Sequence, residues 1–166
     1  RLDPPDRRSG RAIRKPEAIQ PPALTDEQTA ALAAIDPGAG FSVHLLHGVT
    51  GSGKTEVYLR LVEQALAAGR QALLLVPEIN LTPQLEGRVR ARFPDAGVVS
   101  LHSELAEAAR ERNWRGAFAG EASIILGTRL SIFTPLPRLG LIVIDEEHDP
   151  SFKQQDGMRY SERDVG

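Results

Sequence analysis

Residues 42–59 read SVHLLHGVTGSGKTEVYL, and this stretch decides the fold class. Its apolar start predicts a strand over residues 42–47. From Lys54 onward the pattern predicts a helix over residues 54–68, which Gly69 closes. The octapeptide GVTGSGKT at 48–55 connects the two and satisfies G-x-x-x-x-G-K-[ST]. A glycine-rich loop between a strand and a helix predicts a phosphate-binding loop.

The residue types of this loop suit a polyphosphate. Its glycines let the backbone approach an anion closely, and the N–H groups of the loop and the helix start converge on the phosphate. Lys54 is expected to bridge the β- and γ-phosphates, and Thr55 to place a hydroxyl on Mg²⁺. The alternative is a glycine-rich turn that contains a lysine by chance. The residues expected to bind the nucleotide are Gly48, Val49, Thr50, Gly51, Ser52, Gly53, Lys54 and Thr55.

Strands and helices alternate along the rest of the chain. Unbroken apolar runs predict strands at 71–76, 98–101, 123–126 and 139–144, and helical patterns cover 24–35, 81–93 and 104–119. Trp114 and Phe118 lie four residues apart, on one face of the last of these helices. Alternating elements of this kind predict an α/β fold with a mainly parallel sheet and helices on both faces.

Composition sets limits on this fold. The chain has 166 residues and 41% hydrophobic content, enough for one domain, and it has no cysteine for disulfides or thiolate metal sites. Residues 1–22 hold five prolines, with six basic and three acidic side chains, so we expect a flexible linker there and a domain over 23–166. The net charge of −2 therefore leaves an acidic body, which argues against nucleic-acid binding over the whole surface. We expect no membrane span and a cytoplasmic protein.

The second half of the expected nucleotide site follows the apolar run at 141–144. Asp145 stands at the carboxyl end of that predicted strand, where a carboxylate reaches the Mg²⁺ held by Thr55. Glu146 is placed to accept a proton from the attacking water, which an ATPase needs. His148 is expected to link the site to a moving neighbour. The alternative for this acidic run is a solvated loop.

Gln28 has two interpretations. In the first, Thr25-x-x-Gln28 is a capping box, in which the glutamine amide satisfies a backbone N–H at a helix start. In the second, the amide recognises the edge of adenine, since it offers a donor and an acceptor side by side. The local pattern alone favours the cap.

The segments LLLVPEINLTPQ (73–84) and ILGTRLSIFTPLPRLGLIVIDEEHDPSFKQQDGMRYSERDV (125–165) join the loop in a wider resemblance. The chain resembles the superfamily 2 helicases, and within them the bacterial replication-restart DNA helicases. The similarity covers residues 24 onward and implies a RecA-like P-loop NTPase lobe with a DEAH-type box. It also implies ATP and Mg²⁺ as cofactors, with Lys54, Asp145 and Glu146 as the catalytic residues, and makes Gln28 the adenine reader.

The resemblance further implies residues that contact DNA or couple it to ATP. Segment 77–84 and Gly127-Thr128-Arg129 match backbone-contacting motifs, and the loop after the acidic box matches an aromatic-rich loop on which bases could stack. The residues expected in these roles are Thr82, Gln84, Thr128, Arg129, His148, Phe152, Lys153 and Tyr160.

The same family continues with a further helicase motif, a zinc-binding insertion and a second lobe that carries an arginine finger. The resemblance therefore implies a truncated first motor lobe, inactive by itself, with zinc only elsewhere in the protein. Implied partners are forked and single-stranded DNA, single-stranded DNA-binding protein and other primosome proteins, near the nucleoid. Two alternatives stay open. One is a P-loop kinase or GTPase, although no N/T-K-x-D guanine motif occurs. The other is a nucleotide-responsive interaction module without enzymatic activity.

Overall fold

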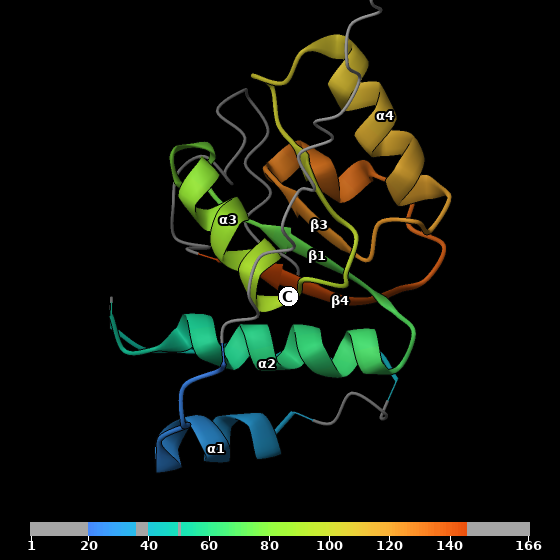
Figure 1. The fold of residues 1–166 in the computed structure, drawn as a ribbon. Helices are drawn as coiled ribbons and strands as arrows, with labels where there is room; N and C mark the ends of the chain where they lie inside the picture. The colour runs from blue at the N-terminus through green and yellow to red at the C-terminus, as the bar shows by residue number, and fades with distance from the viewer. Residues whose placement is uncertain (1–19, 36–39, 50, 146–166) are drawn as a thin grey trace, which may run out of the picture.

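A computed structural model describes residues 20–35, 40–49 and 51–145 of the chain (Figure 1). Helices and strands alternate along it as expected. The α-helices are α1 (Asp26–Ala33), α2 (Lys54–Ala67), α3 (Pro83–Arg92) and α4 (Glu107–Phe118). The strands are β1 (Gln71–Leu75), β2 (Val98–Leu101), β3 (Ile124–Gly127) and β4 (Leu139–Ile144), and the 3-10 helices are η1 (Glu78–Asn80) and η2 (Arg129–Phe133).

The four described strands form one parallel sheet in the order β2-β3-β1-β4. Each strand is followed by a crossover before the next one, so the carboxyl ends of all four lie at the same edge of the sheet. The central strand β1 is fully buried along its length, as its continuous apolar sequence predicted. The predicted parallel α/β fold with helices on both faces is confirmed.

Helices cover the two faces of the sheet with separate hydrophobic cores. On one face Tyr58 and Val62 of α2 and Val89 of α3 pack against alternate residues of β1 and β3. On the other face Ala117 of α4 packs with Leu73 and the neighbouring inward residues. Figure 1 shows α1 beyond α2, on the side of α2 that faces away from the sheet. The sheet therefore holds α2, and the loop before it, in a fixed position.

Local chemistry explains where the helices begin. Thr25 caps α1 and forms the predicted capping box with Gln28. Thr82 caps α3 by accepting a hydrogen bond from the Leu85 backbone N–H, at 3.3 Å. Pro83 is the first residue of α3, where its missing N–H costs nothing, so the proline begins this helix and does not interrupt it.

The predicted strand over residues 42–47 is wrong for this structure. These residues make no strand ladder, and the side chains of Val43 and Leu45 are 82% and 80% exposed. An apolar run supplies the propensity for a strand, but a strand also needs a neighbour with which to pair its backbone N–H and C=O groups. Among the described strands, none pairs with this segment.

The strand β4 is less buried than its sequence predicted. Leu141 and Val143 pack against the core on the α2 face, whereas Ile142 and Ile144 are 42% and 48% exposed. In the described part of the chain, β4 pairs only with β1, so its second edge carries no ladder. Apolar residues on both faces of β4 indicate that both faces are buried. The described residues cover only the face that carries Leu141 and Val143.

Candidate functional site

The phosphate-loop residues and the acidic strand end meet beside the first turns of α2. The backbone of Gly53 is the N-cap of α2 and has a φ of +83°, in the left-handed region that favours glycine. A Cβ at this position would also collide with the side-chain amide of Gln28. The backbone angle therefore favours glycine at 53, and a larger residue would also displace the Gln28 amide from its present position.

Lys54 turns back into the loop. Its ammonium donates a hydrogen bond to the carbonyl oxygen of Gly48, so the lysine side chain reaches back to the first residue of the loop. The loop is further closed by a bond from the Ser52 N–H to the Val49 carbonyl, at 3.1 Å. The Lys54 ammonium thus lies beside the backbone of the loop, as expected for a phosphate-binding lysine.

The two predicted magnesium ligands converge on one phenol. The Tyr58 hydroxyl lies 3.3 Å from Thr55 Oγ1 and 3.3 Å from Asp145 Oδ2. Asp145 is held at the end of β4 because its N–H donates to the Leu75 carbonyl at 2.9 Å and so extends the ladder between β1 and β4. Thr55 comes from α2 and Asp145 from the sheet, 90 residues apart in sequence. The structure brings both together as the sequence predicted.

Tyr58 was not predicted as a site residue. Its ring is part of the core beneath α2, which leaves only the hydroxyl at the site. Burial raises the pKa of the phenol, the hydrogen bond with Thr55 lowers it by less, and the Asp145 carboxylate raises it again. The pKa therefore lies above its ordinary value and the phenol stays protonated at neutral pH. The available signal was the spacing of three residues from Thr55, which places both side chains on one helix face.

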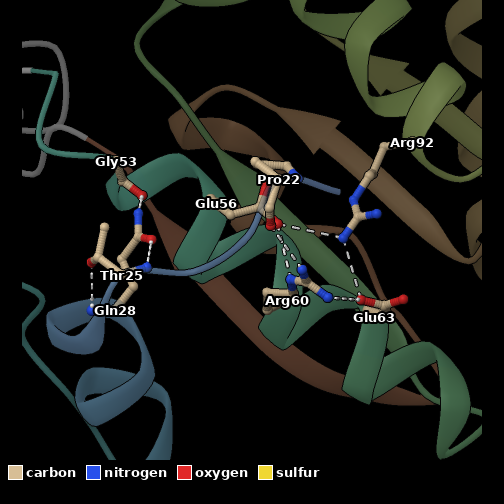
Figure 2. A network of polar contacts seen from close by, with 8 residues as sticks. All are labelled: Pro22, Thr25, Gln28, Gly53, Glu56, Arg60, Glu63 and Arg92. Atoms are coloured by element: carbon tan, nitrogen blue, oxygen red, sulfur yellow. Dashed lines mark hydrogen bonds and ion pairs between the residues drawn. The ribbon is translucent and has the colours of Figure 1, made fainter. Parts of the chain in front are cut away.

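Gln28 joins α1 to the loop. Its Oε1 accepts from the Thr25 N–H at 2.9 Å, and its Nε2 donates to the Gly53 carbonyl at 3.1 Å (Figure 2). The capping interpretation is therefore confirmed. An amide nitrogen has a second proton and an amide oxygen a second lone pair, so the cap leaves Gln28 with further hydrogen-bonding capacity at the loop.

An ion-pair network holds the start of α2 in place (Figure 2). Glu56, which directly follows Thr55, pairs with Arg60 at 2.9 Å and with Arg92 of α3 at 3.5 Å. Arg60 also donates to the carbonyl of Pro22 at 3.1 Å. The network links α2, α3 and the segment before α1, and so stiffens the helix whose first turn carries the site.

A second feature lies at the same edge of the sheet, on the side of β1 toward β3 and β2. A groove of about 580 Å³ opens where these three strands end, between η1, η2 and α4. It brings together Thr128 and Arg129, both predicted to contact DNA, with His102, Arg110 and Trp114, which were not predicted. Trp114 stacks on Phe118 with ring centroids 5.5 Å apart, which confirms that the two share a face. Thr82 and Gln84 lie at the start of α3, where Thr82 is the helix cap.

Several predicted residues lie outside the described part of the chain. They are Thr50, Glu146, His148, Phe152, Lys153 and Tyr160. Within the described ranges, no group of three or more His, Asp or Glu side chains is arranged to hold a metal ion. No described helix is both long enough and apolar enough to cross a bilayer.

Residues 25–165 match the DEAD/DEAH box helicases. The chain belongs to this helicase family. The helicase domain implies the use of ATP and Mg²⁺ in general, and membership decides against a small-molecule kinase or a GTPase.

Curated relatives of the helicase chain share one name. Over 137 residues it is 53% identical to the replication restart protein PriA of Synechocystis, which covers 82% of this chain and 16% of that protein. It is 47% identical over 142 residues to PriA of Haemophilus influenzae, covering 86% of this chain and 19% of the relative. It is 45% identical over 149 residues to PriA of Bacillus subtilis, covering 88% of this chain and 18% of the relative. The chain thus spans about a fifth of the length of these relatives.

Proposed function

We propose that this chain is the ATP-binding first motor lobe of a 3′-to-5′ DNA helicase that acts in replication restart and primosome assembly at stalled forks. The observation that carries the proposal is the convergence of the Thr55 hydroxyl and the Asp145 carboxylate on one atom, beside the folded phosphate loop. Family membership and the relatives' common name support the helicase activity and its context.

The donor set fits a magnesium nucleotide. A hydroxyl and a carboxylate are oxygen ligands of the kind Mg²⁺ takes, and Lys54 adds a positive charge for the phosphates. Bound Mg·ATP supplies the phosphoanhydride that is hydrolysed. Lys54 and the backbone N–H groups of residues 48–55 bind its phosphates, Thr55 and Asp145 hold the metal, and Glu146 accepts the proton of the attacking water. Gln28 uses its remaining donor and acceptor for the adenine edge.

The groove between η1, η2 and α4 is the proposed path for single-stranded DNA. Arg110 and Arg129 supply positive charge for phosphates, and Trp114 offers an exposed aromatic face for base stacking. Two arginines beside a single acid, Glu78, make the groove locally positive, which also agrees with a net acidic body that does not favour DNA elsewhere. We propose that Thr82 and Gln84, at the start of α3, contact the backbone of the same DNA strand. His148, Phe152, Lys153 and Tyr160 are proposed to couple DNA binding to the nucleotide site.

The wider context is proposed from the relatives. Forked DNA, single-stranded DNA-binding protein and other primosome proteins are the expected partners, in the bacterial cytoplasm at the nucleoid. Zinc is expected in other parts of the full-length protein, as the helicase resemblance implies, and the two-lobe mechanism assigns hydrolysis to the complete motor.

The phosphate loop is tested by Lys54→Ala in the full-length protein. Removing the ammonium takes charge stabilisation from the transition state, so we expect ATP hydrolysis to fall by roughly 10²-fold or more while fork binding persists. Arg115→Ala is the matched control, since Arg115 is an exposed cation of α4 that pairs with Glu111 at 2.6 Å, within its own helix. Near-normal turnover in Lys54→Ala would remove the assignment.

The direction and substrate are tested by unwinding assays on partial duplexes with a 3′ or a 5′ single-stranded tail. We expect the full-length protein to unwind the duplex with the 3′ tail, along which it can translocate from 3′ to 5′, and not the duplex with the 5′ tail. In a separate binding assay, Trp114→Ala should weaken single-strand binding by roughly 5-fold or more. If the full-length protein binds ATP but neither hydrolyses it nor unwinds either duplex, the interaction-module alternative is correct.

A further inference from the structure

Tyr58 occupies the junction between the two elements that carry the metal ligands. It lies one turn into α2, three residues after Thr55, and its side chain is only 8% exposed. The ring packs in the same core as Leu141 and Val143 of β4, so its position is fixed by α2 and the sheet together. A packed aromatic ring leaves its hydroxyl little freedom, which makes this oxygen a rigid reference point for both ligands.

Proton accounting fixes the direction of the two hydrogen bonds. A phenol has one proton, and an ionised carboxylate can only accept. Tyr58 therefore donates to Asp145 Oδ2, and the Thr55 hydroxyl donates its own proton to the phenol oxygen, each at 3.3 Å. The result is a directed chain from Thr55 through Tyr58 to Asp145.

This chain leaves the metal-binding lone pairs available. The Thr55 hydroxyl donates its proton to Tyr58, so the lone pairs of its oxygen point elsewhere. Asp145 accepts from Tyr58 through Oδ2, and among the described contacts its Oδ1 stays available. Groups behind metal ligands commonly orient them in this way, and their removal lowers metal affinity without removing a ligand.

We propose that Tyr58 is a positioning residue that holds the Thr55 hydroxyl and the Asp145 carboxylate in register for Mg²⁺, and so sets the magnesium dependence of nucleotide binding. The inference rests on the proposed nucleotide site and names a part of it outside the phosphate loop and the acidic box. Tyr58 acts on the metal through its two neighbours, while Lys54 acts on the phosphates directly.

Tyr58→Phe tests this role because it removes the hydroxyl and keeps the ring. The probe is a fluorescent N-methylanthraniloyl ATP, titrated into the full-length protein at a series of MgCl₂ concentrations and in EDTA. We expect the magnesium concentration for half-maximal binding to rise by about 5- to 30-fold, with nucleotide affinity in EDTA unchanged. The manganese titration should shift in the same direction.

Ser100→Ala is the matched control. Ser100 is a buried hydroxyl that donates to the Glu86 carboxylate at 2.7 Å, on β2 at the opposite edge of the sheet from β4. It should lower the unfolding temperature, as Tyr58→Phe also should, and leave the magnesium dependence unchanged. A shift of equal size in both variants would mean that Tyr58 acts only through stability.

A double-mutant cycle with Asp145→Asn separates positioning from packing. The amide cannot serve as the same charged acceptor, so adding Tyr58→Phe to Asp145→Asn should cause much less than the shift seen in the wild-type background. An unchanged magnesium dependence in Tyr58→Phe, or tighter magnesium binding, would overturn the inference. If the wild-type protein fails to bind the nucleotide at any magnesium concentration, the proposed function itself has failed.

Discussion

At the scale of single residues, the site combines groups with different tasks. Lys54 donates to the Gly48 carbonyl inside the loop, Thr55 and Asp145 are the proposed oxygen ligands, and the Tyr58 hydroxyl lies within hydrogen-bonding distance of both. Glu146 follows Asp145 directly in sequence and is the proposed base. Because the proposal assigns nucleotide binding and proton transfer to different side chains, substitutions should separate the two steps.

Glu146→Gln in the full-length protein should keep nucleotide binding and lose turnover. The amide has the shape of the carboxylate but cannot accept the proton of the attacking water, so hydrolysis should drop by about 10²- to 10⁴-fold. Binding of a fluorescent ATP analogue and steady-state hydrolysis measure the two steps separately. If the folded variant no longer binds the analogue, Glu146 has a structural role.

Gln71 is a buried residue with a purely structural task. Its Nε2 donates to the carbonyls of Ala117 and Ala122 at 2.9 and 2.7 Å, and its Oε1 accepts from the Arg138 N–H at 3.0 Å. Gln71→Leu would remove all three bonds: the Ala122 carbonyl and the Arg138 N–H would lose this partner, and the Ala117 carbonyl would keep the Gly120 N–H, at 3.1 Å. We expect the free energy of unfolding to fall by about 3 kcal/mol or more, measured by urea denaturation. Gln84→Leu, at an exposed position of α3, is the control and should change little.

At the scale of elements, polar contacts tie helices to the sheet as much as apolar packing does. Glu86 of α3 accepts hydrogen bonds from Ser100 of β2 at 2.7 Å and from Arg90 on its own helix. Burial alone would raise the pKa of the Glu86 carboxyl, but the bonds from Ser100 and Arg90 outweigh burial and lower the pKa below its ordinary value. The contact between α3 and β2 is therefore sensitive to acid.

The sign of this dependence follows from the lowered pKa. The ionised form is favoured in the folded chain, so its contribution to stability is complete above the unfolded pKa and is lost as the pH falls through the folded pKa. The stability advantage of the wild type over Glu86→Gln should therefore shrink between about pH 6 and about pH 3. Thermal unfolding across that range measures it, with Glu111→Gln at an exposed pair of α4 as the control. A difference that stays constant over the range would contradict this account.

Local chemistry predicted some elements well and others not at all. Residues 98–101 and 139–144 form strands with the predicted bounds, α2 begins at Lys54, and Asp145 lies at a strand end near Thr55. These features depend on short-range patterns and on the common edge of a parallel sheet. Residues 42–47 have the same apolar pattern and form no strand, because pairing depends on a neighbour distant in sequence.

The remaining site features also depend on contacts between distant residues. Tyr58 lies on a helix face that local sequence marks as core, and only the approach of β4 brings Asp145 to its hydroxyl. Gln71 sits in an otherwise apolar run, and its partners come from α4, the turn before β3 and the segment before β4. A propensity for helix or strand does not specify such partners, so a single sequence could not indicate them.

At the scale of the whole molecule, the proposed nucleotide site lies at the carboxyl edge of the sheet. Phosphoryl transfer needs charge neutralisation from both sides, and an arginine finger is typically worth about 10³ to 10⁵ in rate. We therefore expect the 166-residue chain alone to bind Mg·ATP weakly and to lack DNA-stimulated hydrolysis, and the full-length protein to show both. Parallel steady-state assays with and without fork DNA check this. Equal DNA-stimulated rates in the two forms would defeat the two-lobe account.

The second edge of β4 has a practical consequence for work with the isolated chain. Among the described residues β4 pairs on one side only, so its second edge presents a row of backbone donors and acceptors there, flanked by the half-exposed Ile142 and Ile144. Natural proteins cover, twist or charge such edges because they template intermolecular pairing. The exposed apolar side chains of segment 41–45 add a second surface that favours association. At high concentration the isolated chain should therefore self-associate through β4, and its solubility should depend on whatever covers that strand.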